Sequence, residues 1–167
     1  SQSFLPIYES LTNGIRQIIS GLRPVMLNSG LYTGLIGLVA ELTDRHEDGP
    51  AISLDVTPST ARYDLQVELY LYRIVQQACD NALRHAQAQT IRICGRLEPE
   101  EIELAVEDDG IGFAVEPEFS VDRLIADKHF GLAGMSERAE LINARMEINS
   151  AIGRGTTARI VWRPKSK

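Results

Sequence analysis

The sequence has few of the features that mark several common classes of protein. Only 2 of its 167 residues are cysteines, Cys79 and Cys94, and no Cys/His spacing suits a zinc site. The longest apolar stretch, residues 31–42, contains glycines and is shorter than the ~20 residues that a membrane-spanning helix needs. Neither a zinc module nor a membrane span is therefore expected, and both cysteines are interpreted as small buried hydrophobes in a reducing cytosol.

Basic charge is also scarce. The chain has a formal net charge of −6 and a pI near 5.1, whereas binding along a duplex requires a clustered basic face. We therefore expect no direct nucleic acid binding, although one phosphorylated small ligand is compatible with this charge. Because no signal peptide is visible, the chain is expected to be a cytoplasmic domain, and a membrane anchor elsewhere in a longer parent protein stays open.

The first residues carry the pattern of a helix that packs against other helices. Apolar residues recur at alternating spacings of four and three, which is the a/d seam of a bundle, at Phe4, Tyr8, Leu11, Ile15, Ile18 and Leu22. The helix belongs either to a dimerisation bundle or to the core of its own domain. Because Pro24 ends the pattern, we place a dimerisation segment at 1–23, a linker at 24–29 and a globular domain at 30–167.

The rest of the chain mixes helical and strand periodicity. Helices are expected at 31–42, 67–88 and 132–143, and Asp64 is the candidate N-cap of the longest one. Alternation of period two predicts strands at 51–56, 90–97, 101–106, 146–149 and 157–162. This order predicts an α/β fold, a two-layer α/β sandwich with helices on one face of a mixed sheet, plus an N-terminal helix from a dimerisation bundle.

One candidate ligand segment follows a strand, at residues 108–112, with the sequence Asp-Asp-Gly-Ile-Gly. Its glycines allow a backbone to approach a ligand closely, and Asp108, at a strand end, offers a buried carboxylate that can accept hydrogen bonds. Taken alone, the segment is explained equally well as a turn after a strand.

A second candidate lies on the long helix. Gln77 and Asn81 share one helical face with either Arg84 or His85. An amide oxygen can ligate a metal, and arginine and histidine can meet phosphate oxygens. The spacing alone also fits a solvated polar stripe.

Two further segments are rich in glycine. Residues 131–135 open a helix, whose free N–H groups and positive dipole end make a natural anion site, although a plain glycine-rich cap explains them too. The aperiodic stretch before it, residues 113–130, is long enough to be a lid. Residues 153–157 form a glycine turn before the last strand, as a β-hairpin would.

Together these segments resemble the ATP-binding domain of sensor histidine kinases, in the wider group that includes gyrase, the heat-shock chaperone of the same fold and the mismatch-repair ATPases. Residues 71–86 look like the family's N box, 108–112 like its DxGxG box, 131–135 like its second glycine box and 153–156 like its GxGT end. The resemblance covers about residues 30 to 163. It is closest to the subgroup whose partner regulators carry LuxR-like helix-turn-helix domains.

The resemblance implies ATP and Mg²⁺ as cofactors and gives the residues roles. Asp108 would accept a hydrogen bond from the adenine amino group, Asn81 would hold Mg²⁺, and Gln77 and Asn81 occupy the catalytic positions. The residues expected around the nucleotide are Asn81, Arg84, His85, Asp108, Gly110, Gly112, Gly131, Leu132, Gly134 and Thr156.

The implied reaction is transfer of the γ-phosphoryl group to a histidine nitrogen on an upstream helix. None of the 3 histidines, His46, His85 and His129, lies in such a helix, so the acceptor is expected outside this chain. The implied partners are the protein's own dimerisation and phosphoacceptor domain, as a homodimer in the full-length protein, and a response regulator with a LuxR-like DNA-binding domain.

One departure from the family pattern keeps alternatives open. Gln77 stands where the family usually has glutamate, and glutamine can orient a water or a metal ligand but cannot take a proton. Asp80 is a candidate substitute base, although it points about 100° away around the helix. We favour a kinase domain; a degenerate ATP-binding regulatory domain without turnover and a response-regulator-binding scaffold are the alternatives.

Overall fold

The computed structural model describes residues 7, 11, 23–114 and 131–166. Helices and strands follow each other in the expected order, with boundaries that differ from the predicted ones by a few residues. They are a 3₁₀ turn η1 (Val25–Ser29), α2 (Leu31–Arg45), β1 (Ala51–Val56), α3 (Leu65–His85), β2 (Thr90–Leu97), β3 (Ile102–Asp108), α5 (Leu132–Leu141), β4 (Arg145–Ser150) and β5 (Thr156–Trp162).

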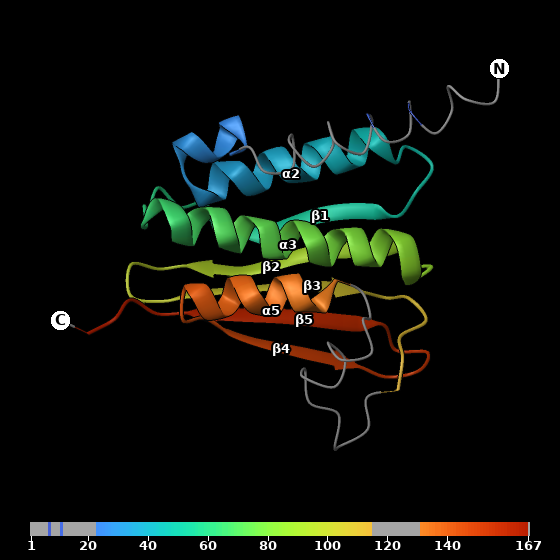
Figure 1. The fold of residues 1–167 in the computed structure, drawn as a ribbon. Helices are drawn as coiled ribbons and strands as arrows, with labels where there is room; N and C mark the ends of the chain where they lie inside the picture. Colours follow the sequence, from blue (N-terminus) through green and yellow to red (C-terminus); the bar gives the residue numbers. More distant parts are fainter. Residues whose placement is uncertain (1–6, 8–10, 12–22, 115–130, 167) are drawn as a thin grey trace.

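The strands form one mixed sheet in the order β1-β2-β3-β5-β4. β1 pairs with β2 in parallel, whereas the β2–β3, β3–β5 and β4–β5 pairs are antiparallel. Figure 1 shows α2, α3 and α5 together on one side of this sheet. The predicted two-layer α/β sandwich is therefore confirmed, and β2 and β3 form an antiparallel hairpin within it.

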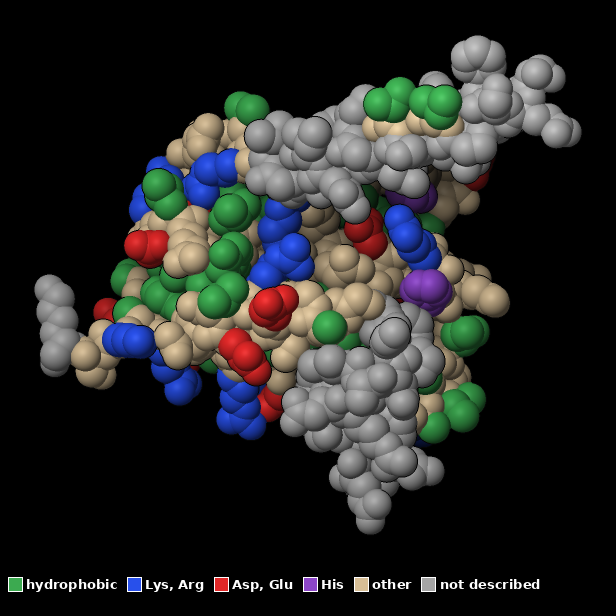
Figure 2. Space-filling model, viewed as in Figure 1, with side chains coloured by type: hydrophobic (Ala, Val, Ile, Leu, Met, Phe, Trp, Pro, Cys, Tyr) green, Lys and Arg blue, Asp and Glu red, His purple; other side chains and the backbone are tan. Residues whose placement is uncertain are grey.

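Alternation along the strands separates the two faces of the sheet. Side chains facing the helices form the core, among them Ile91, Ile93, Ile102 and Leu104, each fully buried. The other face carries charges in cross-strand register. There the Arg92 guanidinium bonds to the carboxylates of Asp55 and Glu107, and these two hydrogen bonds raise the pKa of Arg92. On the helix side, Figure 2 shows acidic and basic side chains interspersed.

Local interactions set the ends of α3. The Asp64 carboxylate accepts from the Gln66 N–H at 2.9 Å, so the helix begins at Leu65 with the predicted cap in place. The expected end at residue 88 was wrong. The helix stops at His85 because the Ala86 carbonyl accepts from the Ile111 N–H at 2.7 Å, and Gln87 then adopts a positive φ of 50°.

The predicted N-terminal heptad helix falls almost entirely outside the described residues. The segment expected as a linker, 24–29, contains the 3₁₀ turn η1, in which Leu27 is fully buried while Val25 is exposed. A single turn is too short to show periodicity, which is why the sequence did not reveal it. Within the described part of the chain, no helix combines the length and apolar character needed to cross a membrane.

The burial of Leu27 leads to a testable expectation about where the folded unit begins. Leu27→Ala should lower the free energy of unfolding by roughly 2–5 kcal/mol, because a fully buried side chain leaves a cavity when truncated. Val25→Ala, on the same turn but 81% exposed, should change it by less than about 0.5 kcal/mol. Urea unfolding followed by circular dichroism measures both. Equal, small effects would mean that the domain begins after residue 29.

Candidate functional site

A cavity of about 300 Å³ lies between α3, α5 and the helix-facing side of the sheet. This volume is at the lower end of the roughly 300–1,000 Å³ typical of small-molecule sites. Its walls come from α3, β3, the loop after β3, α5, β4 and β5. The lining residues are Ala78, Asn81, Ala82, His85, Ala86, Val106, Asp108, Ile111, Gly112, Phe113, Leu132, Met135, Ile148, Thr156 and Ala158.

Small side chains on α3 make the room for this cavity. Ala78, Ala82 and Ala86 are spaced by four, so they form one stripe along the helix face that lines it. Leucine at any of these positions would fill the space with side-chain atoms. The walls are therefore mostly apolar, with polar groups confined to a few places, as is usual in small-molecule sites.

Asp108 is the carboxylate that lines the cavity. It ends β3 and is half-buried, and its Oδ1 accepts from the Gly110 N–H at 2.9 Å. No other hydrogen bond to this carboxylate is seen among the described residues, so Oδ2 has lone pairs for a ligand donor. The sequence expectation of a buried carboxylate is corrected to a half-buried one, because the cavity leaves one side of it open.

The glycines after Asp108 permit close backbone packing. A Cβ on Gly110 would lie 2.1 Å from the Ala86 carbonyl oxygen, and one on Gly112 would lie 2.1 Å from the Ala151 carbonyl oxygen. Both distances are far inside van der Waals contact. Gly112 also has a φ of +60°. Glycine is thus needed at both positions, as predicted. The backbone that comes close there is the protein's own and not a ligand.

Asp109, the neighbour of Asp108, has a different role. Its Oδ1 accepts from the backbone N–H groups of Gln89, at 2.8 Å, and Thr90, at 2.9 Å. These backbone hydrogen bonds, the one from Thr90 foremost, hold the pKa of the Asp109 carboxyl below its ordinary value. Asp109 therefore ties the loop after β3 to the start of β2, while Asp108 faces the cavity.

The amides of Gln77 and Asn81 are directly bonded. Gln77 Nε2 donates to Asn81 Oδ1 at 3.1 Å, and Asn81 Nδ2 lies 4.0 Å from the Met135 sulfur. A Cβ built on Gly131, the left-handed N-cap of α5, would lie 3.1 Å from Gln77 Nε2. Asn81 lines the cavity, whereas Gln77 lies behind it and against the start of α5.

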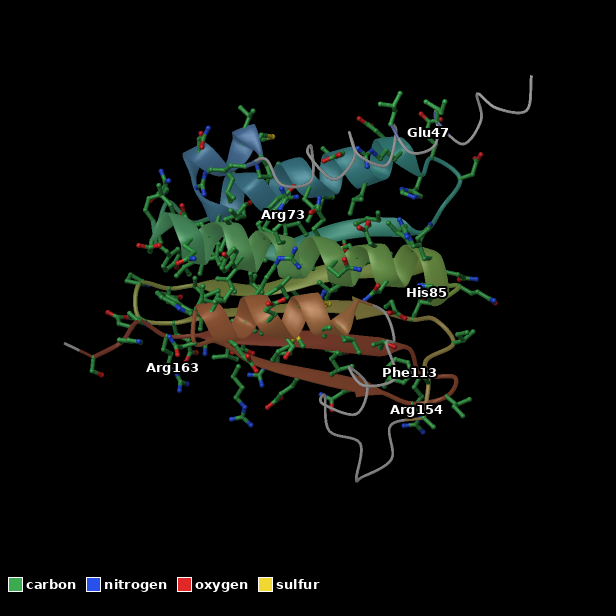
Figure 3. The ribbon with its side chains drawn as sticks, viewed as in Figure 1. Glu47, Arg73, His85, Phe113, Arg154 and Arg163 are labelled. Atoms are coloured by element: carbon green, nitrogen blue, oxygen red, sulfur yellow. The ribbon has the colours of Figure 1, made fainter. Side chains whose placement is uncertain are left out.

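The structure distinguishes between the two basic residues at the end of α3. His85 lines the cavity and lies at the same end of the molecule as Phe113 (Figure 3). Arg84 is exposed and is not among the lining residues; its charge instead acts on Asp80. Burial raises the pKa of Asp80, and the positive charges of Arg84 and of Arg45 on α2 act in the opposite direction. Asp80 is not among the residues that line the cavity, which argues against it as a substitute base.

Ser150 is a functional position that sequence reasoning missed. Its hydroxyl accepts from the Phe113 N–H at 2.9 Å, donates to the Gly155 carbonyl at 3.0 Å and lies 2.8 Å from the Thr156 hydroxyl. It thereby holds the loop after β3 against the β4–β5 turn, beside the predicted residue Thr156. A lone serine at a strand end gives no signal in the sequence.

Most of the predicted site residues lie together. Those that line the cavity are Asn81, His85, Asp108, Gly112, Leu132 and Thr156, and those placed next to it or outside it are Gln77, Arg84, Gly110, Gly131 and Gly134. The apolar walls were not predicted, although the alanine spacing on α3 carries a signal. The expected lid, 113–130, lies outside the described residues from position 115 onward.

Comparison with known proteins assigns this arrangement to a family. A family model described as histidine kinase-, DNA gyrase B- and HSP90-like ATPase matches residues 66–166, which include every residue that lines the cavity. The chain belongs to this family. Within it, the chain is an ATP-binding catalytic domain of the sensor histidine kinase type.

Curated relatives agree with the family match. The chain is 32% identical over 151 residues to the oxygen sensor histidine kinase NreB of Staphylococcus carnosus (strain TM300), covering 90% of this chain and 41% of that protein. It is 34% identical over 146 residues to the sensor histidine kinase ComP of Bacillus subtilis (strain 168), covering 87% of this chain and 18% of that protein. The chain thus spans less than half the length of these relatives.

A solved structure shows the same fold. The histidine kinase AdeS of Acinetobacter baumannii superposes with a TM-score of 0.66 at 16% identity, over 97% of this chain and 82% of that one. At this identity the likeness supports the architecture alone.

The hydrogen bonds of Asp109 predict a pH-dependent contribution to stability. Its folded pKa is depressed, so the stabilisation is present above the unfolded value of about 3.9 and is lost as the pH falls through the folded pKa. Asp109→Asn removes this charge-dependent part. In urea unfolding between pH 7 and pH 3, the free energy of unfolding of the parent should fall more steeply than that of the variant. The difference in free energy between the two proteins, the gap, should therefore narrow in acid. A gap that stays constant with pH would contradict this role.

Proposed function

We propose that this domain binds Mg·ATP in the cavity beside α3 and transfers the γ-phosphoryl group to a histidine on a dimerisation helix outside this chain. The observation that carries the proposal is the placement of Asp108. It is the carboxylate that lines a mostly apolar cavity, and its Oδ1 is held by the Gly110 N–H. Such a group accepts a hydrogen bond from the amino group of a flat base.

The position of the base sets the direction in which the rest of the nucleotide extends. With the base at Asp108, backed by Thr156, the phosphates extend toward Asn81, His85 and the start of α5. The first N–H groups of α5, from Gly131 to Gly134, have no partner within the helix and favour an anion. We expect Arg84 to reach the phosphates from outside the cavity wall.

Mg²⁺ fits this site as an ion coordinated both by the protein and by the phosphates. No cluster of histidine, cysteine or carboxylate side chains suited to a metal occurs in the described part of the chain. Asn81 Oδ1 is an oxygen of the type that Mg²⁺ accepts, and Mg²⁺ commonly takes its other ligands from phosphates and water. Bound there, the metal would offset phosphate charge. Gln77 Nε2 donates to Asn81 Oδ1, an amide oxygen with two acceptor lone pairs, so the metal would share this oxygen with Gln77.

In the transfer step, the bond from the γ-phosphorus to the bridging oxygen breaks, ADP leaves, and a phosphorus–nitrogen bond forms. A neutral imidazole attacks with the lone pair of its unprotonated nitrogen, so no proton has to leave that atom. Gln77 therefore does not prevent attack by histidine, whereas it cannot activate a water molecule as a base. This difference supports a kinase with little hydrolysis.

A second function is favoured by the residue at position 77. Because glutamine cannot take a proton, a degenerate domain that binds nucleotide and signals without turnover is the alternative. For either function we propose the same partners. These are the protein's own dimerisation and phosphoacceptor domain in a homodimer, and a response regulator with a LuxR-like DNA-binding domain.

Calorimetric titration tests nucleotide binding. The parent should bind ATP with Mg²⁺, and Asp108→Asn should weaken binding by about 10- to 100-fold, the equivalent of ~1.5–3 kcal/mol for a hydrogen bond to a charged group. Asp109→Asn is the matched control, because it removes the neighbouring charge, which lies outside the cavity lining. Its affinity should equal that of the parent. Absence of binding by the folded parent would overturn the proposal.

Substitution at position 77 tests turnover. In a chain that includes the phosphoacceptor helix, Gln77→Glu should raise ATP hydrolysis by roughly 10²-fold, because glutamate can act as a base toward water, and should leave phosphotransfer to histidine unchanged. Gln76→Glu is the control, since Gln76 bonds to Arg73 at 2.8 Å and points to a different side of α3. Radiolabelled ATP measures both. Phosphotransfer by neither the parent nor Gln77→Glu would favour the binding-only alternative.

A further inference from the structure

One charged side chain is fully buried in the described part of the chain, and it lies far from the cavity. Glu68, in the first turn of α3, has an exposed fraction of 0%. An ionised carboxylate in such a position is strongly unfavourable unless it is paired and hydrogen-bonded. The groups that pair with Glu68 are therefore constrained to stay close to it.

Two arginines and one backbone N–H surround this carboxylate. Arg62 donates from Nε to Oε2 at 3.1 Å and from its terminal nitrogen to Oε1 at 3.2 Å, and the Tyr63 N–H donates to Oε2 at 3.4 Å. The hydrogen bond to Glu68 raises the pKa of Arg62. The second arginine, Arg23, donates to Oε1 at 3.4 Å.

Arg23 makes further bonds that Arg62 does not. Its Nε donates to Asn28 Oδ1 at 3.1 Å, one terminal nitrogen donates to the Leu65 carbonyl at 3.0 Å, and the other donates to the Leu27 carbonyl at 3.4 Å. The guanidinium thus joins η1 to the first residues of α3. A planar fork with five donors can satisfy several acceptors in this way, which a lysine cannot.

The turn that follows Arg23 is itself held firmly on the domain. Leu27 is fully buried, and a Cβ on Gly34 of α2 would lie 2.8 Å from its side chain. Arg23 is also the last residue of the segment predicted to be a dimerisation helix. Arg23, just before this turn, is therefore bonded to α3 through its side chain while the turn packs on α2.

We propose that Arg23 is a positioning residue that fixes the preceding segment to the N-terminal end of α3, through a latch formed by Arg23, Glu68, Leu65 and η1. α3 continues from the latch to His85, which lies at its far end in Figure 3, a span of about 30 Å for 21 residues. A shift of the preceding segment is then passed to the helix that carries Asn81. The latch does not depend on the proposed function, whereas its use in signalling rests on that function.

The latch can be tested by distance measurement in the full 167-residue chain. Nitroxide labels are placed at Leu11→Cys and at Glu140→Cys, which is exposed on α5, in a Cys94→Ser background; Cys79 is fully buried and stays. Double electron–electron resonance gives the distribution of label distances. Arg23→Gln should broaden it about twofold or more, because the preceding segment loses its attachment.

Arg62→Gln is the matched control. It removes one guanidinium from the same carboxylate and leaves Glu68 paired with Arg23 and the Tyr63 N–H. The proposal expects the parent's width in this variant. Equal widths in the parent and Arg23→Gln, or equal broadening in both variants, would overturn it. If Arg23→Gln fails to fold, as judged by circular dichroism, Arg23→Lys replaces it, and the distribution should still broaden because lysine cannot bridge the same acceptors.

Titration with ATP separates this inference from the proposed function. Arg23→Gln should bind Mg·ATP as the parent does, because Asn81 lies roughly 20 Å along α3 from Glu68. If neither chain binds ATP, the proposed function fails while the latch is still decided by the distances. Loss of binding in Arg23→Gln alone would mean that Arg23 is needed for the ATP site to form, and would overturn a role confined to positioning the preceding segment.

Discussion

The backbone of Ile111 joins three parts of the domain, and the cavity depends on it. Its N–H donates to the Ala86 carbonyl at 2.7 Å, and its carbonyl accepts from the Gly153 N–H at 2.7 Å. The end of α3, the loop after β3 and the β4–β5 turn are therefore held at hydrogen-bond distance. Glycine is required on both sides of Ile111, because a Cβ on Gly110 or Gly112 would overlap a carbonyl oxygen.

This constraint also separates the roles of two adjacent aspartates. Successive residues at a strand end point to opposite sides, so one of them meets the neighbouring strand and the other meets the cavity. Asp109 accepts from the backbone at the start of β2, and Asp108 lines the cavity beside α3. We thus assign stability to Asp109 and ligand recognition to Asp108. Substituting these two residues one at a time separates the two properties experimentally.

α3 connects the two ends of the domain. Its first turn holds the buried Glu68 between Arg23 and Arg62, and its last turns carry Asn81 and His85 into the cavity. Rigid secondary-structure elements are among the structures that carry energetic coupling between distant sites, and α3 spans the distance between these two. The same element therefore serves as a wall of the site and as the attachment of the preceding chain.

The sequence by itself determined the element order, the two-layer sandwich and the position of the site, because hydrophobic periodicity and glycine spacing are local properties. It placed Asp64 as a cap and brought Asp108, Asn81 and Thr156 together through the family resemblance. Only the tertiary structure decided that His85 lines the cavity while Arg84 does not, that Ser150 supports the wall, and that Arg23 reaches Glu68. These facts depend on contacts between residues far apart in the chain, and no local pattern encodes which of two adjacent side chains will face a partner.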